Sequence, residues 1–156
     1  MLSLRTILHP TDFSDRSRCA FSVACALARD YNARLVVLHV DHLSLAVYGD
    51  VLAAPRREDY QDRLREQLHA LQAPGVAVEH RLNEGTPITE ILGVAEETHA
   101  DLIVMGTHGR TGLGRLLMGS VAEQVVRKAP CPVMTVRVPF PAAVPAPKPV
   151  AAAAQV

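Results

Sequence analysis

Residues 105–120, MGTHGRTGLGRLLMGS, are the stretch whose residue types point most directly to chemistry. They hold glycines at positions 106, 109, 112, 114 and 119 together with His108, Arg110 and Arg115, and they contain no acidic residue. Glycines let backbone N–H groups approach a ligand without interference from a Cβ atom, and such groups form concavities that bind anions. The stretch therefore predicts a phosphate site, although a glycine-rich loop after a strand also serves as a plain flexible connection.

The end of this stretch strengthens the phosphate interpretation. Gly119 and Ser120 open an expected helix at 120–129, in which Ser120 and Glu123 have the spacing of a capping box. The first N–H groups of a helix carry partial positive charge, which favours a phosphate oxygen, and Arg110 can add a charged contact. The loop matches neither a P-loop nor a dinucleotide fingerprint, so the residues alone indicate an anion site and no particular ligand.

The elements that must position this loop alternate along the chain. Apolar, β-branched runs predict strands, the run 33–40 is continuous enough to be covered on both faces, and 75–85 alternates as an edge strand does. Helical spacing of apolar residues, together with prolines and capping residues at the expected first turns, predicts the helices between them. The expected strands are 4–9, 33–40, 75–85, 101–106 and 131–138, and the expected helices are 14–32, 55–72, 86–100 and 120–129.

Particular residues support these helices. In the first helix Ser14 is the expected N-cap, and Ala20, Val23, Ala24, Leu27 and Tyr31 are the expected apolar face. Pro55 suits the first turn of the second helix, whose apolar stripe is Tyr60, Leu64, Leu68 and Leu71. Thr86 and Pro87 suit the cap and first turn of the third helix.

The alternation predicts an α/β fold, a doubly wound, Rossmann-like sheet of five parallel strands with helices on both faces. With the strand order 3-2-1-4-5, the winding reverses between strands one and four, and ligands bind at such a point. This order places residues 10–14, PTDFS, beside the glycine loop. Two segments distant in the sequence are therefore expected to line one crevice.

Composition bounds the remaining possibilities. Residues 1–138 are long enough for one domain, the Pro- and Ala-rich stretch 139–156 is expected to be a disordered tail, and 41–54 carries no readable motif. Sixteen basic residues balance sixteen acidic ones and Trp is absent, which argues against nucleic acid as a partner. No signal peptide or membrane span is evident, so a cytoplasmic protein without a membrane partner is expected. The three cysteines match no metal or redox spacing and are expected to be small buried apolar residues.

Two motifs at opposite ends of this pattern resemble a known family. ILHPTDFS (7–14), Gly106, Gly109, Gly119 and Ser120 in the spacing Gly-x2-Gly-x9-Gly-Ser, and the closing APCPVMTVR are similar to the ATP-binding branch of the universal stress protein family. The resemblance covers about residues 3–138. It implies a stress-response protein that binds ATP.

The resemblance also implies roles for individual residues. Asp12 would hold the ribose hydroxyls, Pro10, Thr11 and the backbone of Val40 would line the adenine, and the loop would wrap the triphosphate. ATP would bring Mg²⁺ or Mn²⁺ on its phosphates, and two copies would form a homodimer through the last strand, 131–138. The remaining contacts implied by the family pattern are Met105, Gly106, His108, Gly109, Arg110, Gly119, Ser120 and Val121.

The sequence favours a nucleotide-dependent regulatory module over two other classes of function. A weak ATPase or autokinase would need a base near the γ-phosphate, and His108 is the evident candidate close to the loop. A protein-built metal site would draw on His9, Asp12, His39, Asp41 and His42, but alternate strand residues face opposite sides and few of these can converge. No catalytic residue and no metal ligand is therefore assigned, and His9 and His39 are expected to be packed, hydrogen-bonded histidines.

Overall fold

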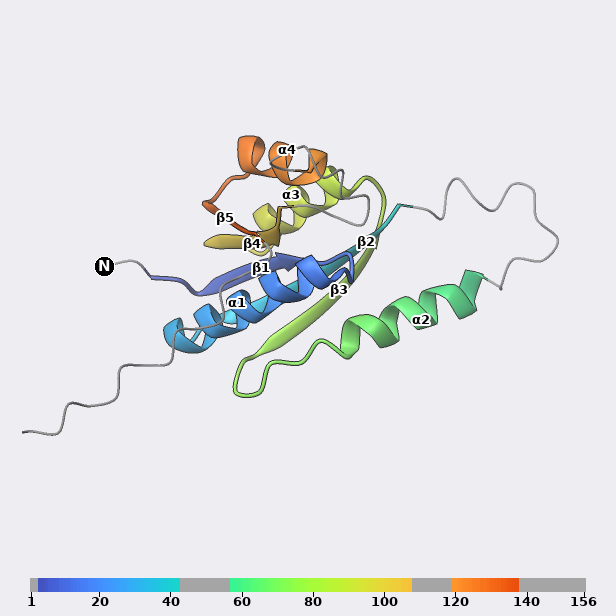
Figure 1. The fold of residues 1–156 in the computed structure, drawn as a ribbon, viewed down its shortest axis with the longest axis horizontal. Helices are drawn as coiled ribbons and strands as arrows, with labels where there is room; N and C mark the ends of the chain where they lie inside the picture. The colour runs from blue at the N-terminus through green and yellow to red at the C-terminus, as the bar shows by residue number, and fades with distance from the viewer. Residues whose placement is uncertain (1–2, 43–56, 108–118, 138–156) are drawn as a thin grey trace, which may run out of the picture.

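The computed structural model describes residues 3–42, 57–107 and 119–137. Its strands form one five-stranded sheet in the order β3-β2-β1-β4-β5, and every neighbouring pair is parallel. The predicted fold class and strand order are therefore confirmed. The strands, labelled in Figure 1, are β1 (Thr6–Pro10), β2 (Arg34–Asp41), β3 (Val78–Glu84), β4 (Leu102–Gly106) and β5 (Val133–Val136).

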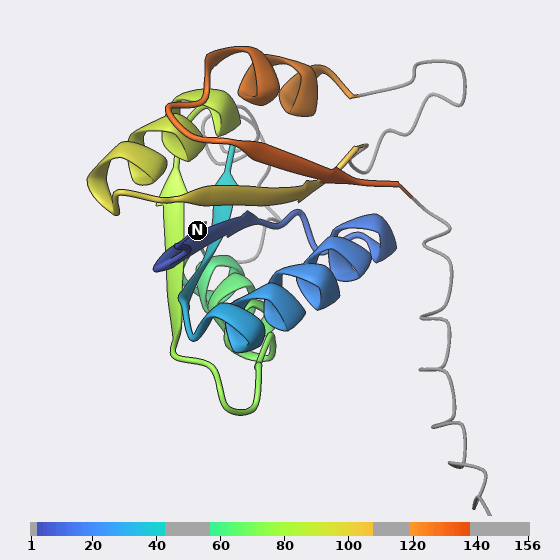
Figure 2. The same cartoon turned by 90° about the vertical axis from the view of Figure 1, so that its left-hand side faces the viewer.

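Helices cover both faces of the sheet, as predicted. Figure 2 shows α1 and α2 on one side and α3 and α4 on the other. Two apolar cores result, because successive strand residues point to opposite faces: Ile7 belongs to the core under α1, and Leu8 to the core under α3 and α4. The helices are α1 (Asp15–Tyr31), α2 (Arg57–His69), α3 (Pro87–Glu97) and α4 (Ser120–Lys128).

The central position predicted for β2 and the edge position predicted for β3 are both confirmed. Every residue of β2 after Arg34 is buried, as expected for a central strand covered on both faces, and β3 lies at the edge of the sheet. β3 begins at Val78 rather than at residue 75. The reason is Gly75, whose φ of +78° belongs to a turn that precedes the strand.

α1 begins as predicted but its apolar face ends differently. The Ser14 side chain accepts a hydrogen bond from the backbone of Ser17, and Asn32, with φ of +51°, ends the helix. Tyr31 was expected in the core and is 42% exposed, whereas Cys25 and Ala28 are buried. Helical spacing predicts the direction of a side chain, but the side chain is buried only where another element packs against it, and this need not extend to the last residue of a helix.

The first turns of α3 and α4 match the predicted positions but not the predicted capping bonds. Pro87 is in the first turn of α3, but the Thr86 side chain makes no capping hydrogen bond to a described residue. The N-cap of α4 is Gly119, and Ser120 is its first helical residue, so the predicted capping box is wrong by one position. Leu64 and Leu68 of α2 are buried as predicted, Tyr60 is half-buried, and Leu71 lies beyond the helix end at His69; the predicted start at Pro55 lies outside the described residues.

The cysteines were expected to be buried, and the structure buries them to different degrees. Cys25 is buried, Cys19 and Cys131 are half-buried, and all three are free thiols. The predicted tail 139–156 and most of segment 41–54 lie outside the described residues. In the part of the chain that the structure describes, no helix is long and apolar enough to cross a membrane.

Candidate functional site

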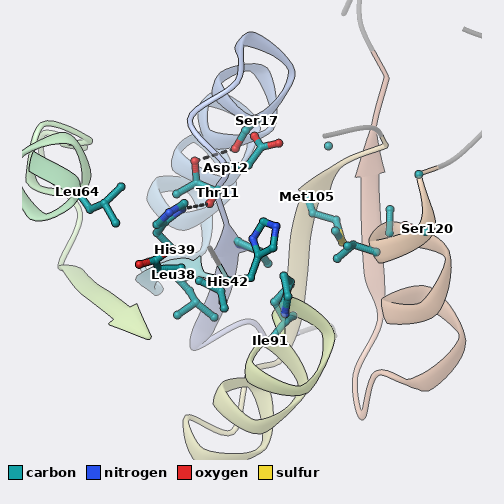
Figure 3. Close-up of a pocket in the computed structure, with 18 of the residues that line it drawn as sticks. Thr11, Asp12, Ser17, Leu38, His39, His42, Leu64, Ile91, Met105 and Ser120 are labelled. Atoms are coloured by element: carbon teal, nitrogen blue, oxygen red, sulfur yellow. Dashed lines mark hydrogen bonds between the residues drawn. The ribbon is translucent and has the colours of Figure 1, made fainter. Parts of the chain in front are cut away.

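A cavity of about 440 Å³ lies where β1, β2 and β4 end. These strands are parallel, so their carboxyl ends meet at one edge of the sheet, and the strand order reverses between β1 and β4. Figure 3 shows Thr11 and Asp12 on one side of the cavity, with Met105 and Ser120 on the other. The crevice predicted from the strand order is therefore present.

The turn after β1 is tied down by hydrogen bonds from several directions. The Thr11 N–H donates to the Leu38 carbonyl at 2.8 Å, and the Ser17 hydroxyl donates to Thr11 Oγ1 at 2.8 Å. The Ser14 N–H donates to Asp12 Oδ1 at 3.0 Å, which is an Asx-type turn before the helix. These bonds hold Asp12 at the cavity wall in a defined backbone conformation.

His39 and Phe13 brace the same turn. His39 is buried, and its Nδ1 lies 2.8 Å from the Thr11 carbonyl oxygen, so Nδ1 carries the hydrogen. Phe13 has φ of +62°, and its ring lies 4.4 Å from the His39 ring, centroid to centroid. Positive φ is costly for a bulky residue, so this strained turn persists because its surroundings hold it.

The backbone of Val40 faces the cavity for a reason that follows from the strand pairing. The even-numbered residues of β2 turn their peptide groups toward β1: Arg34 N–H donates to Arg5, and the Leu38 carbonyl accepts from Thr11. β1 ends at Pro10, opposite Leu38, so the N–H and carbonyl of Val40 point past the end of that strand. A donor N–H and an acceptor carbonyl on one residue, both facing the same way, can pair with the edge of a planar heterocycle.

The opposite wall is the end of β4 and the start of α4. The Gly119 N–H donates to the Thr107 carbonyl at 2.6 Å, which joins the residue after β4 to the residue before α4. Gly119 has no side chain, and no described side chain caps the first turn of α4. The N-terminus of this helix, with its partial positive charge, therefore lies at the cavity.

The structure brings together most of the residues predicted for the site. His108, Gly109 and Arg110 lie outside the described residues. All the others line the one cavity: Pro10, Thr11, Asp12, Val40, Met105, Gly106, Gly119, Ser120 and Val121.

Reasoning from the sequence missed the walls supplied by α2 and α3. Tyr60 and Leu64 of α2 line the cavity with Pro87 and Ile91 of α3. Tyr60 and Leu64 were assigned to the apolar stripe of a surface helix, and spacing alone cannot tell a residue that packs on the sheet from one that borders a cavity.

His9 and His39, two of the three histidines considered as metal ligands, are packed as predicted, whereas His42 is exposed. The His9 Nδ1 lies 2.8 Å from the Val104 carbonyl oxygen, its ring packs against Phe21, and Nε2 finds no partner among the described residues. Burial lowers the pKa of His9 to about 4, against smaller opposing effects of the Val104 hydrogen bond and the Asp12 charge. Within ranges 3–42, 57–107 and 119–137, no three His, Cys, Asp or Glu side chains are grouped to hold a metal ion.

Comparisons with known proteins agree with this fold and cavity. The solved structure of protein MJ0577 of Methanocaldococcus jannaschii has a TM-score of 0.70 at 30% identity, covering 87% of this chain and 97% of that one. A universal stress protein solved in complex with cAMP has a TM-score of 0.64 at 30% identity, covering 87% of this chain and 98% of that one.

Sequence comparison identifies the family directly. Universal stress protein MJ0531 of Methanocaldococcus jannaschii is 38% identical over 141 residues, covering 86% of this chain and 83% of that protein. The model of the universal stress protein family matches residues 3–137, which include every described strand and helix. The chain therefore belongs to the universal stress protein family.

Proposed function

We propose that the protein binds ATP in the cavity at the carboxyl edge of its sheet and acts as a nucleotide-dependent regulatory module in the stress response. The observation that carries this proposal is the convergence of two distant segments, Thr11–Asp12 and Gly119–Ser120, on one cavity of about 440 Å³. Cavities of this size, mostly apolar with a few polar groups, are typical of small-ligand sites.

Each end of the cavity offers what one part of the nucleotide needs. The Asp12 carboxylate can accept hydrogen bonds from two neighbouring ribose hydroxyls, and the N–H and carbonyl of Val40 can read the adenine edge. Gly106, Gly119 and the first turn of α4 leave room and partial positive charge for phosphates. Mg²⁺ or Mn²⁺ would arrive on those phosphates. The relative solved with cAMP supports a nucleotide as the ligand class.

The first test identifies the ligand. Freshly purified protein is denatured, any released nucleotide is identified by chromatography and mass spectrometry, and the emptied protein is titrated with ATP and Mg²⁺ by calorimetry. We expect ATP to bind and to stay intact over hours. Steady release of ADP would make the protein an ATPase, and failure to bind ATP would remove the proposed function.

The second test assigns the site with two variants and matched controls. Asp12→Asn keeps an oxygen for the Ser14 N–H but removes the charge, and we expect ATP affinity to fall about tenfold or more. Asp30→Asn, at the exposed far end of α1, is the control. Gly119 has φ of −71° and ψ of 155°, which valine adopts without backbone strain, so Gly119→Val adds bulk at the N-cap of α4.

The two variants should differ in which part of the ligand they affect. Gly119→Val should weaken ATP far more than adenosine, because the added methyl groups occupy the phosphate end of the cavity. Gly93→Val, on the exposed face of α3 where a Cβ meets open space, should change neither. Unchanged ATP affinity in both Asp12→Asn and Gly119→Val would refute the assignment of the site.

The second part of the proposal concerns assembly and location. The strand β5 lies at the edge of the sheet, and Met134 on it is 39% exposed. An exposed edge needs a partner or a cover, and antiparallel pairing of β5 with its copy across a two-fold axis would give a homodimer. We propose that this dimer is cytoplasmic.

A further inference from the structure

The Thr11–Asp12 turn receives a side-chain hydrogen bond from a neighbouring strand, donated by the buried His39 of β2, which lies outside the motif 7–14. We propose that His39 is a positioning residue, which aims the Asp12 carboxylate at the ribose through its hydrogen bond to the Thr11 carbonyl. This inference rests on the proposed nucleotide site. It adds to that site a residue, His39, that affects the ligand by positioning Asp12.

The geometry supports control of one peptide plane. The Thr11 carbonyl and the Asp12 nitrogen belong to the same peptide unit, so a bond that holds the carbonyl also holds the plane that contains the Asp12 nitrogen and Cα, from which the side chain leaves the chain. His39 Nδ1 lies 2.8 Å from that oxygen. Figure 3 marks this hydrogen bond with a dashed line. The Thr11 N–H is held from the same strand by the Leu38 carbonyl at 2.8 Å. β2 therefore makes hydrogen bonds to the backbone on both sides of the Thr11 Cα.

The His39 ring has a second contact that serves the same end. Phe13, next after Asp12, has φ of +62°, and its ring lies 4.4 Å from that of His39 with the planes inclined by 33°. One buried side chain thus contacts the backbone immediately before Asp12 and the side chain of the residue immediately after it. Because Asp12 Oδ1 also accepts the Ser14 N–H, a loosened turn would move the carboxylate as well as the backbone.

Two substitutions separate these contacts. His39→Phe keeps an aromatic ring beside Phe13 but removes the donor to Thr11. His39→Asn restores a nitrogen donor at the place of Nδ1 and removes the ring. If His39→Phe does not fold, His39→Ala takes its place, because it removes the donor without adding bulk. Thermal unfolding and circular dichroism establish that each variant is folded.

The test measures affinities for ATP and for 2′,3′-dideoxy-ATP, which lacks the hydroxyls assigned to Asp12. His39→Phe should weaken ATP about tenfold, change dideoxy-ATP by less than about twofold, and add almost nothing in the Asp12→Asn background. His39→Asn should recover most of the ATP affinity. Equal losses for both nucleotides, or additive effects with Asp12→Asn, would overturn the positioning role.

A readout without ligand separates this proposal from the nucleotide proposal. Amide hydrogen exchange at Phe13 and Ser14 should accelerate at least tenfold in His39→Phe and return toward the wild-type rate in His39→Asn. Unchanged exchange would overturn the positioning role even where ATP binds. A wild-type protein that binds no ATP would instead refute the proposed function and the ribose assignment with it.

Discussion

At the scale of single residues, His9 and His39 differ in their surroundings, and the surroundings decide the role of each side chain. His9 and His39 both donate from Nδ1 to a backbone carbonyl, which fixes their rings, but His9 lies in the core under α1 and His39 borders the cavity. His9 is fully buried, so its cationic form is strongly disfavoured. It therefore couples protonation to unfolding rather than to ligand binding.

The first prediction concerns the pH dependence of stability. The pKa of His9 is about 4 in the folded protein and 6.5 in the unfolded chain. Below pH 6.5 the unfolded chain takes up a proton that the native protein does not, so stability is full above that pH and is lost as pH falls toward 4. Because of this proton uptake at His9, we expect the free energy of unfolding to fall by about 2 kcal/mol between pH 7 and pH 5.

Urea unfolding at a series of pH values measures this loss. His9→Asn keeps a donor for the Val104 carbonyl and does not titrate, so the free energy of unfolding should fall less steeply toward pH 5 than in the wild type. His99→Asn is the control, because His99 is exposed at φ of +49°, a conformation that asparagine accepts. Parallel pH profiles for wild type and His9→Asn would contradict the prediction.

At the scale of elements, the start of α1 links helix stability to the cavity. Ser14 caps the helix, and the same residue donates its N–H to Asp12 Oδ1. Its carbonyl accepts the first helical hydrogen bond, from Arg18, at 3.0 Å. The helix and the turn that carries Asp12 are therefore joined at one residue.

The second prediction is that Ser14→Ala destabilises the protein by about 1 kcal/mol, since one N–H of the first turn loses its side-chain acceptor. Ser22→Ala is the matched control. The Ser22 hydroxyl donates to the Arg18 carbonyl within the exposed middle of the same helix, where alanine is the better helix former. Denaturant unfolding should show a loss for Ser14→Ala and no loss for Ser22→Ala; equal values would refute the capping role.

At the scale of the whole molecule, the two edges of the sheet differ in charge. On β3, Glu79 pairs with Arg34 of β2 and with Arg81, and Arg81 pairs with Glu97 of α3. β5 consists of Val133–Val136 and carries no charge. Charges protect an edge from pairing with another chain, so the contrast favours β5 as the edge where two copies meet.

The third prediction uses the direction of the peptide groups on β5. The Pro132 and Val136 carbonyls accept from Ile103 and Thr107 of the β4 side, so the N–H of Thr135 points away from β4. Thr135→Pro removes that outward donor without touching the pairing of β5 with β4. We expect a dimeric wild type, a monomeric Thr135→Pro variant and a dimeric Thr135→Ala control in sedimentation experiments. A monomeric wild type, or a dimeric Thr135→Pro variant that is folded by circular dichroism, would contradict pairing through β5.

The sequence by itself determined the order of elements, the sheet and the place of the cavity. Apolar spacing and turn residues are local signals, and parallel strands with short crossovers leave few possible orders. The convergence of Asp12 with Gly119 and Ser120 was therefore predictable from the strand order.

The tertiary structure alone decided which side chains share a contact across elements. The exposure of Tyr31, the lining of the cavity by Tyr60 and Leu64, and the bond from His39 to Thr11 depend on which elements meet, and at what separation. Residue spacing along one element gives the direction of a side chain, but the element packed opposite decides whether that side chain is core, cavity wall or support for the site.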